Sequence, residues 1–124
     1  MQTMTKEHAQ KLFDRWVSAL GLGEWEIRFN WCVRGIDMPD RETLGVTRYC
    51  LSSMQAEVSM VAEEDAPESG FAYDYERTLV HELMHIKLAV VDDSGDKVHD
   101  NTVHMLVEQM ARALVKAKRG EANC

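Results

Sequence analysis

The chain has 124 residues, 45% of them hydrophobic and 28% charged, which predicts a single soluble domain over residues 1–124 with a core of its own. Its formal net charge of −7 argues against a general binder of nucleic acid or of anionic membranes, and no apolar run reaches membrane-spanning length. Because the N-terminus lacks the apolar stretch of a signal peptide and none of the cysteines belongs to a Cys-x-x-Cys pair, we expect a cytoplasmic protein without a disulfide framework. We also expect a monomer.

The first predicted element is an amphipathic helix over residues 5–20, followed by the stop signals Gly21 and Gly23. Residues 25–33 then alternate between apolar and polar side chains, which predicts a strand whose aromatic residues belong to the core. A loop over residues 35–45 separates this strand from the next. The apolar positions of the helix are Ala9, Leu12, Phe13, Trp16, Val17 and Leu20, and those of the strand are Trp25, Ile27, Phe29, Trp31 and Val33.

Two shorter strands are predicted over residues 46–51 and 55–61, with Ser52 and Ser53 at the turn between them. An acidic loop over residues 62–73 follows, and we interpret it as a solvated connection to the main motif of the chain.

That motif lies between Thr78 and Ile86, where His-Glu-x-x-His is embedded in a helix-compatible apolar run. On a helix, His81 and His85 project from one face one turn apart, so their two imidazoles can bind one metal ion. Glu82 is rotated by about 100° from His81, too far to be an equal third ligand but within reach of a water on the metal. This arrangement is typical of a zinc hydrolase in which Glu82 is the general base.

The surrounding helix is predicted over residues 75–91, with Asp74 as its N-cap and a broad apolar surface. We therefore expect His81, Glu82 and His85 to be partly buried, and buried polar groups need partners. The competing interpretation is an ordinary helix whose histidines have satisfied hydrogen bonds. We favour the metal, because it supplies a partner for these adjacent groups.

A final helix is predicted over residues 101–118, with Asp100 or Asn101 as its N-cap. The aspartates of residues 92–96, before it, lack the spacing and the downstream glutamate of an EF-hand calcium loop. The apolar stripe of the final helix comprises Val103, Leu106, Val107, Met110, Leu114 and Ala117.

The segment Thr78 to Ile86 resembles the zincin metallopeptidase signature, in which uncharged residues surround the HExxH; Lys87 departs from it. The order of elements over most of the chain resembles the small single-domain zincins, including phage-type metallopeptidases, SprT-like proteins and minimal gluzincins. The resemblance implies an α+β fold: an N-terminal helix, a small mixed or antiparallel sheet of about three strands, the HExxH helix and a closing C-terminal helix. It also implies that the strand 55–61 lies along the cleft at a sheet edge and pairs with an extended substrate.

Two histidines do not complete a catalytic zinc site, which has three protein ligands and a water. Gluzincins supply a glutamate from a second helix, with an acidic residue one turn later that holds a metal-binding histidine; His104-x-x-x-Glu108 is an altered form of that pattern. His104 borders the apolar stripe of the final helix, so we assign it as the third ligand, with Glu108 as its hydrogen-bonding support. Two rivals stay open. Glu108 can itself be the ligand, or His99 can be, because SprT-like proteins place a third histidine near the start of the next helix.

The leading hypothesis is a zinc-dependent peptidase in which His81, His85 and His104 hold Zn²⁺ and Glu82 activates a water against a peptide or protein substrate. The second hypothesis is a non-catalytic, zinc-stabilised module that binds a peptide or a partner protein. A DNA-associated protease, as among SprT-like proteins, is a weaker third. The acidic charge and the missing zinc ribbon count against it, and we expect no nucleic-acid partner.

Overall fold

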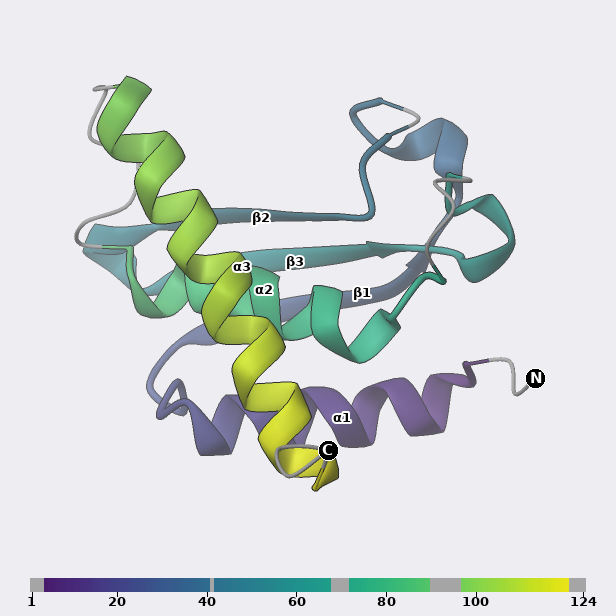
Figure 1. Cartoon of the computed structure of the whole chain (residues 1–124), viewed down its shortest axis with the longest axis horizontal. Helices are drawn as coiled ribbons and strands as arrows, with labels where there is room; N and C mark the ends of the chain where they lie inside the picture. The colour runs from purple at the N-terminus through teal and green to yellow at the C-terminus, as the bar shows by residue number, and fades with distance from the viewer. Residues whose placement is uncertain (1–3, 41, 68–71, 90–96, 121–124) are drawn as a thin grey trace.

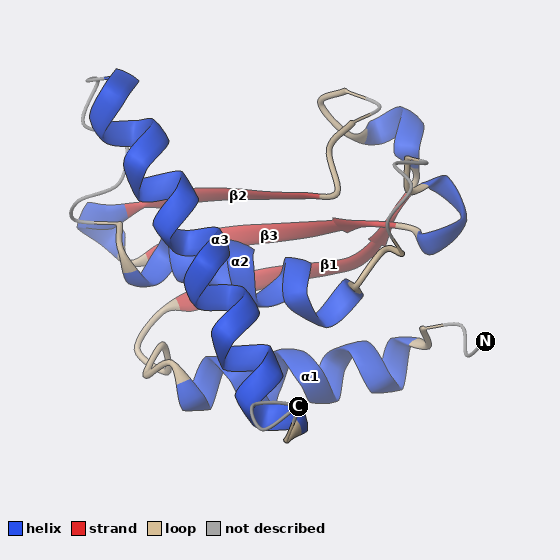
Figure 2. Cartoon of the chain, in the orientation of Figure 1, coloured by secondary structure: helices blue, strands red, loops and turns tan. Residues whose placement is uncertain are grey.

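The computed structural model of the chain describes residues 4–40, 42–67, 72–89 and 97–120. Among these residues it has three α-helices and a mixed sheet of three strands (Figures 1 and 2). This confirms the expected α+β fold class, and the helices and strands follow one another in the expected order. Within the described residues, no helix combines the length and the apolar character needed to cross a membrane.

Helix α1, Lys6–Ala19, begins directly after its N-cap Thr5, whose hydroxyl accepts a hydrogen bond from a backbone N–H of the first turn. The helix ends before Gly21, whose φ of +70° is a left-handed conformation that glycine adopts without strain. One face of α1 is buried, and its residues are among those predicted for the core: Ala9, Leu12, Phe13 and Trp16.

The sheet has the strand order β1–β3–β2. Strand β1 (Glu26–Val33) runs parallel to β3 (Gln55–Val61), and β2 (Gly45–Cys50) runs antiparallel to β3. The expectation that the strand 55–61 lies at a sheet edge is therefore wrong, because β3 is the central strand and β2 is an edge. The parallel pairing of β1 with β3 joins segments far apart in the sequence, and local patterns carry no signal for it.

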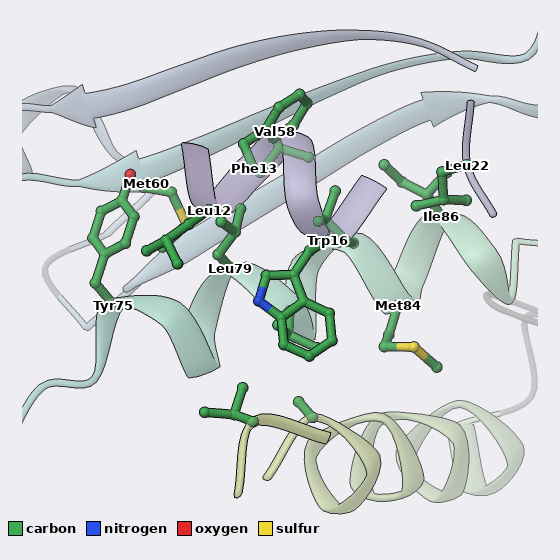
Figure 3. Close-up of a cluster of buried hydrophobic side chains, with 14 of the residues drawn as sticks. Leu12, Phe13, Trp16, Leu22, Val58, Met60, Tyr75, Leu79, Met84 and Ile86 are labelled. Carbon is green, nitrogen blue, oxygen red and sulfur yellow. The ribbon is translucent and has the colours of Figure 1, made fainter. Parts of the chain in front are cut away.

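Helices α1 and α2 (Tyr75–Lys87) pack on one face of the sheet, and α3 (Lys97–Arg119) packs against α2 (Figure 1). The aromatic side chains predicted for the core face these helices, and Phe29 stacks on Phe13 of α1 with ring centroids 4.4 Å apart. Figure 3 shows this core between the strands and α2, with Met84 and Trp16 on the side of α3. The opposite face of the sheet is charged: Glu57 of β3 lies 3.8 Å from Arg28 and 3.7 Å from Arg48, on the neighbouring strands.

Helix α2 is the most deeply buried helix segment. Its N-cap is Asp74, as predicted, with the carboxylate accepting a hydrogen bond from the backbone N–H of Arg77 at 3.1 Å. Leu79, Val80 and Leu83 are 0% exposed, because α2 is covered by the sheet on one side and by α3 on the other. The helix ends at Lys87, earlier than the predicted end at residue 91.

Helix α3 begins at Lys97, earlier than predicted, so Asp100 lies in its first turn instead of capping it. The stripe that α3 buries against α2 also differs from the prediction. Leu106 and Met110 are 46% and 43% exposed, and Ala117 is exposed. Of the predicted stripe, Val103 and Val107 are buried and Leu114 is partly buried against the core. The buried residues of α3 form a row four apart, and its members are Val103, Val107, Ala111 and Val115.

Charged residues join the C-terminal end of α3 to the start of α2. Glu76, which is 7% exposed, accepts hydrogen bonds from the indole of Trp16 at 2.7 Å, from Arg119 at 3.1 Å and from the ammonium of Lys118. Arg119 also donates two hydrogen bonds to Asp74, at 2.8 and 2.9 Å. Helices α2 and α3 therefore run in opposite directions, with the first turn of one held against the last turn of the other.

Burial alone would raise the pKa of Glu76, but the hydrogen bonds from Lys118 and Trp16 and the two cations nearby lower it below its ordinary value. The pKa of Asp74 is lowered in the same way, because its bonds to Arg119 and to the N–H of Arg77 outweigh the effect of burial.

Candidate metal centre

Three histidines from two helices lie together where α2 and α3 cross. The Nε2 atoms of His81 and His85 on α2 are 3.2 Å apart. The ring of His104 on α3 has its centroid 4.8 Å from that of His81 and 5.1 Å from that of His85. One nitrogen from each ring lies within 4.8 Å of the other two, so the group could hold a metal ion. The fold thus brings together the three residues that were predicted as ligands.

The second nitrogen of His81 is held by a carboxylate. Its Nδ1 lies 2.9 Å from Oε1 of Glu108, and Nε of Arg112 donates to the other oxygen of Glu108 at 2.8 Å. Burial alone would raise the pKa of Glu108, but the bonds from His81 and Arg112 lower it below its ordinary value. Because an ionised carboxylate can only accept, we assign a proton to Nδ1 of His81. In the neutral ring this leaves the lone pair on Nε2, the nitrogen that faces His85, free for a metal.

This contact revises the role predicted for Glu108. Glu108 does hold an imidazole, but the ring that it contacts is His81 on α2, whereas the sequence suggested His104 on its own helix. Its position on the Nδ1 side of that ring places it away from the Nε2 atoms that converge between the histidines, which disfavours Glu108 as a ligand. The other rival, His99, belongs to the first turn of α3, and its side chain lies outside the described part of the structure.

The donor set fits zinc. Three imidazoles are a common ligand set for catalytic Zn²⁺, and tetrahedral geometry with Zn–N bonds of about 2.0–2.1 Å requires nitrogens roughly 3.3 Å apart. The separation of 3.2 Å between Nε2 of His81 and Nε2 of His85 agrees with that requirement, and the three donors as a set lie within 4.8 Å of one another. The side chain of His81 is 12% exposed, while His104 is exposed, so the group is buried on one side and open on the other. A fourth position facing solvent is what a catalytic site needs.

A cleft of about 520 Å³ adjoins the histidines, between α2 and the edge strand β2. The strand contributes most of its length to the wall of this cleft, because β2 packs against α2. The residues that line the cleft are Gly45, Val46, Thr47, Arg48, Tyr49, Glu82, His85 and His104.

Glu82 lies in the wall of the cleft and is 7% exposed. Its Oε1 accepts a hydrogen bond from the hydroxyl of Thr47 at 2.6 Å, and the same hydroxyl lies 3.1 Å from the backbone oxygen of Glu82. Sequence reasoning missed Thr47. Nothing in a short strand with ordinary β-forming residues signals that one of them will meet the HExxH glutamate.

Two tyrosines precede the site. Tyr75 donates to the backbone oxygen of Trp31 at 2.7 Å, so its hydroxyl is part of the packing between α2 and β1. The hydroxyl of Tyr73 is buried and has no hydrogen-bond partner among the residues that the structure describes. Burial, with the negative charges of Glu63 and Glu82 nearby, raises the pKa of Tyr73, so this phenol stays protonated at neutral pH.

Comparisons with protein-family models, with curated proteins and with solved structures found no match to this chain. The zincin resemblance therefore stays a prediction based on the motif.

Proposed function

We propose that this protein is a zinc-dependent peptidase. The observation that carries the proposal is the convergence of His81, His85 and His104 beside Glu82, at a cleft bounded by an edge strand. A structural metal site would be enclosed by its ligands and would need no carboxylate in the wall of an open cleft. The open side at His104 and the position of Glu82 both favour catalysis over a structural role.

The residues of the chain have distinct roles in this proposal. The three histidines hold the zinc, and Glu108 fixes the tautomer and orientation of His81. Zinc held there would supply a Lewis acid for the scissile carbonyl and would make the attacking water more acidic. Glu82 accepts a proton from the attacking water and later delivers it to the leaving amine. Its Oε2 is the oxygen available for this transfer, because Oε1 is bonded to Thr47.

The substrate class follows from the cleft. An extended peptide can pair with the outer edge of β2, which is an edge strand of the described sheet and borders the cleft along most of its length. The role first expected for the strand 55–61 thus passes to β2 in the proposal, because β3 has a neighbour on both sides.

The test is the substitution Glu82→Gln in protein loaded with zinc. Wild-type protein is expected to bind about one zinc per chain and to cleave members of a diverse peptide library. Glu82→Gln should keep the zinc and lose cleavage, because the amide cannot accept the proton. Glu57→Gln, the same change on the far face of the sheet, is the matched control and should cleave like wild type.

Cleavage that survives in Glu82→Gln would refute the mechanism. One equivalent of zinc without cleavage of any peptide would instead support the second hypothesis, a zinc-stabilised module that binds a peptide or a partner protein.

A further inference from the structure

We propose that two residues of the edge strand, Gly45 and Thr47, are positioning residues for Glu82: Thr47 anchors one carboxylate oxygen, and Gly45 leaves the space that the side chain occupies. The inference rests on the proposed role of Glu82 as general base.

Thr47 and Gly45 face α2 together. They are two positions apart on β2, and their partners on β3, Val58 and Met60, are core residues with 0% exposure. Alternation along a strand therefore directs both residues toward the helices, where Glu82 lies.

The hydroxyl of Thr47 contacts two atoms of Glu82. It donates to Oε1 at 2.6 Å and lies 3.1 Å from the backbone oxygen of the same residue. Among the described residues, Thr47 is the one hydrogen-bond donor to this carboxylate. A glutamate side chain has three rotatable bonds, so a fixed point at Oε1 restricts the conformations of this carboxylate in the wall of the cleft.

Gly45 contributes by the absence of a side chain. A Cβ at this position would lie 3.0 Å from Cγ of Glu82, 3.2 Å from its Oε2 and 3.2 Å from Cγ2 of Thr78. Its φ is outside the left-handed region, so the backbone itself does not require glycine here. The requirement comes from the side chain of Glu82, which a methyl group would displace.

The two effects are independent and act on one carboxylate. One is an attraction that any residue without a hydroxyl would lose, and the other is a space that any larger residue would fill. Three variants separate these two effects. Thr47→Val removes the hydroxyl and keeps the shape of the side chain, Thr47→Ser keeps the hydroxyl, and Gly45→Ala fills the space. Thr43→Val is the matched control, because the Thr43 hydroxyl bonds to Asp40 in the loop before β2.

The first readout is steady-state cleavage by zinc-loaded protein. Thr47→Val should lower kcat by about 10- to 100-fold, the range for losing one hydrogen bond to a charged group, with KM nearly unchanged. Gly45→Ala should also lower kcat with KM nearly unchanged, because the added methyl group displaces the same carboxylate. Thr47→Ser should recover most of kcat, and Thr43→Val should match wild type. Wild-type kcat in Thr47→Val would overturn the role of Thr47, and wild-type kcat in Gly45→Ala would overturn that of Gly45.

The second readout does not depend on turnover. With glutamate labelled with ¹³C at its carboxyl carbon, the Glu82 signal is identified as the one missing from Glu82→Gln. Thr47→Val and Gly45→Ala should shift this signal, while Thr47→Ser and Thr43→Val should leave it in place. An unshifted signal in Thr47→Val and Gly45→Ala would overturn the inference. If wild-type protein cleaves nothing, the proposed function fails, and this spectrum still decides whether β2 positions Glu82.

Discussion

His81 is the residue at which the two halves of the candidate site meet. One of its nitrogens faces His85 on the same helix, and the other is bonded to Glu108 on α3. A histidine held in this way presents its free nitrogen in one direction before any metal arrives, which lowers the entropic cost of binding. The carboxylate is itself oriented by Arg112, so two consecutive contacts, from Arg112 to Glu108 and from Glu108 to His81, orient one of the candidate ligands.

We expect zinc affinity to fall by different amounts in variants of His104, Glu108 and His99. His104→Ala should weaken binding most, because it removes a ligand. Glu108→Gln should weaken it by about 10- to 100-fold, because it removes only the carboxylate behind His81. His99→Ala should bind like wild type. Competition with a chromogenic chelator measures all three variants, with Glu24→Gln on the exposed surface as the control. A larger loss in His99→Ala than in His104→Ala would reassign the third ligand.

At the scale of the elements, the packing of α3 decides where His104 lies. Val103 and Val107 are buried at 7% and 0% exposure, and they set the rotation of the helix about its own axis. His104 directly follows Val103, so this rotation also directs the third imidazole toward α2. The burial of Val103 and Val107 against α2 thus also determines where the imidazole of His104 lies.

This packing predicts that alanine substitutions at Val107 and Leu106 lower the free energy of unfolding by different amounts, although the sequence pattern placed both residues in one apolar stripe. Val107→Ala should lower the free energy of unfolding by about 2 kcal/mol, because it removes buried methyl groups and leaves a cavity. Leu106→Ala, at a position 46% exposed, should change it by less than about 1 kcal/mol although more atoms are lost. Urea unfolding with the metal content held fixed measures both. Equal costs, or a larger cost for Leu106→Ala, would contradict the described orientation of α3.

The same helix shows why part of the fold could be predicted and part could not. Periodicity identified α1 and β1, because each has one clear apolar face, and the HExxH helix was identified by its motif and its broad apolar surface. In α3 two apolar rows lie side by side, one through Val107 and one through Leu106, and the choice between them depends on the partner helix. The strand order and the contact of Thr47 with Glu82 depend on long-range packing, which a local pattern does not encode.

In the molecule as a whole, the cluster of Asp74, Glu76, Trp16, Lys118 and Arg119 joins three helices. The ionised form of Glu76 is favoured in the folded state, since its pKa is lowered there. Its contribution to stability is therefore fully present above the unfolded-state pKa of about 4.3 and is lost as the pH falls through the lower folded-state pKa.

Glu76→Gln is predicted to reveal this dependence. At pH 7 the variant should be less stable by about 2 kcal/mol, because the hydrogen bonds from Lys118 and Arg119 to this buried side chain lose their charged acceptor. The difference from wild type should shrink below about pH 4, where the wild-type carboxyl also becomes neutral. Urea unfolding of both proteins between pH 3 and 7 measures the difference, so contributions common to both cancel. A difference that does not change over this range would show that the ionisation of Glu76 contributes nothing to stability.

The opposite directions of α2 and α3 separate two kinds of attachment along one helix. The C-terminal end of α3 is fastened by ion pairs, while His104, toward its other end, would be fastened by the proposed metal. The substitution Glu76→Gln would weaken the first attachment and a chelator would remove the second, so the two ends of the same helix can be tested separately. If the proposed metal is bound, each end of α3 has its own attachment, and amide hydrogen exchange along the helix would distinguish loosening at one end from loosening of the whole helix.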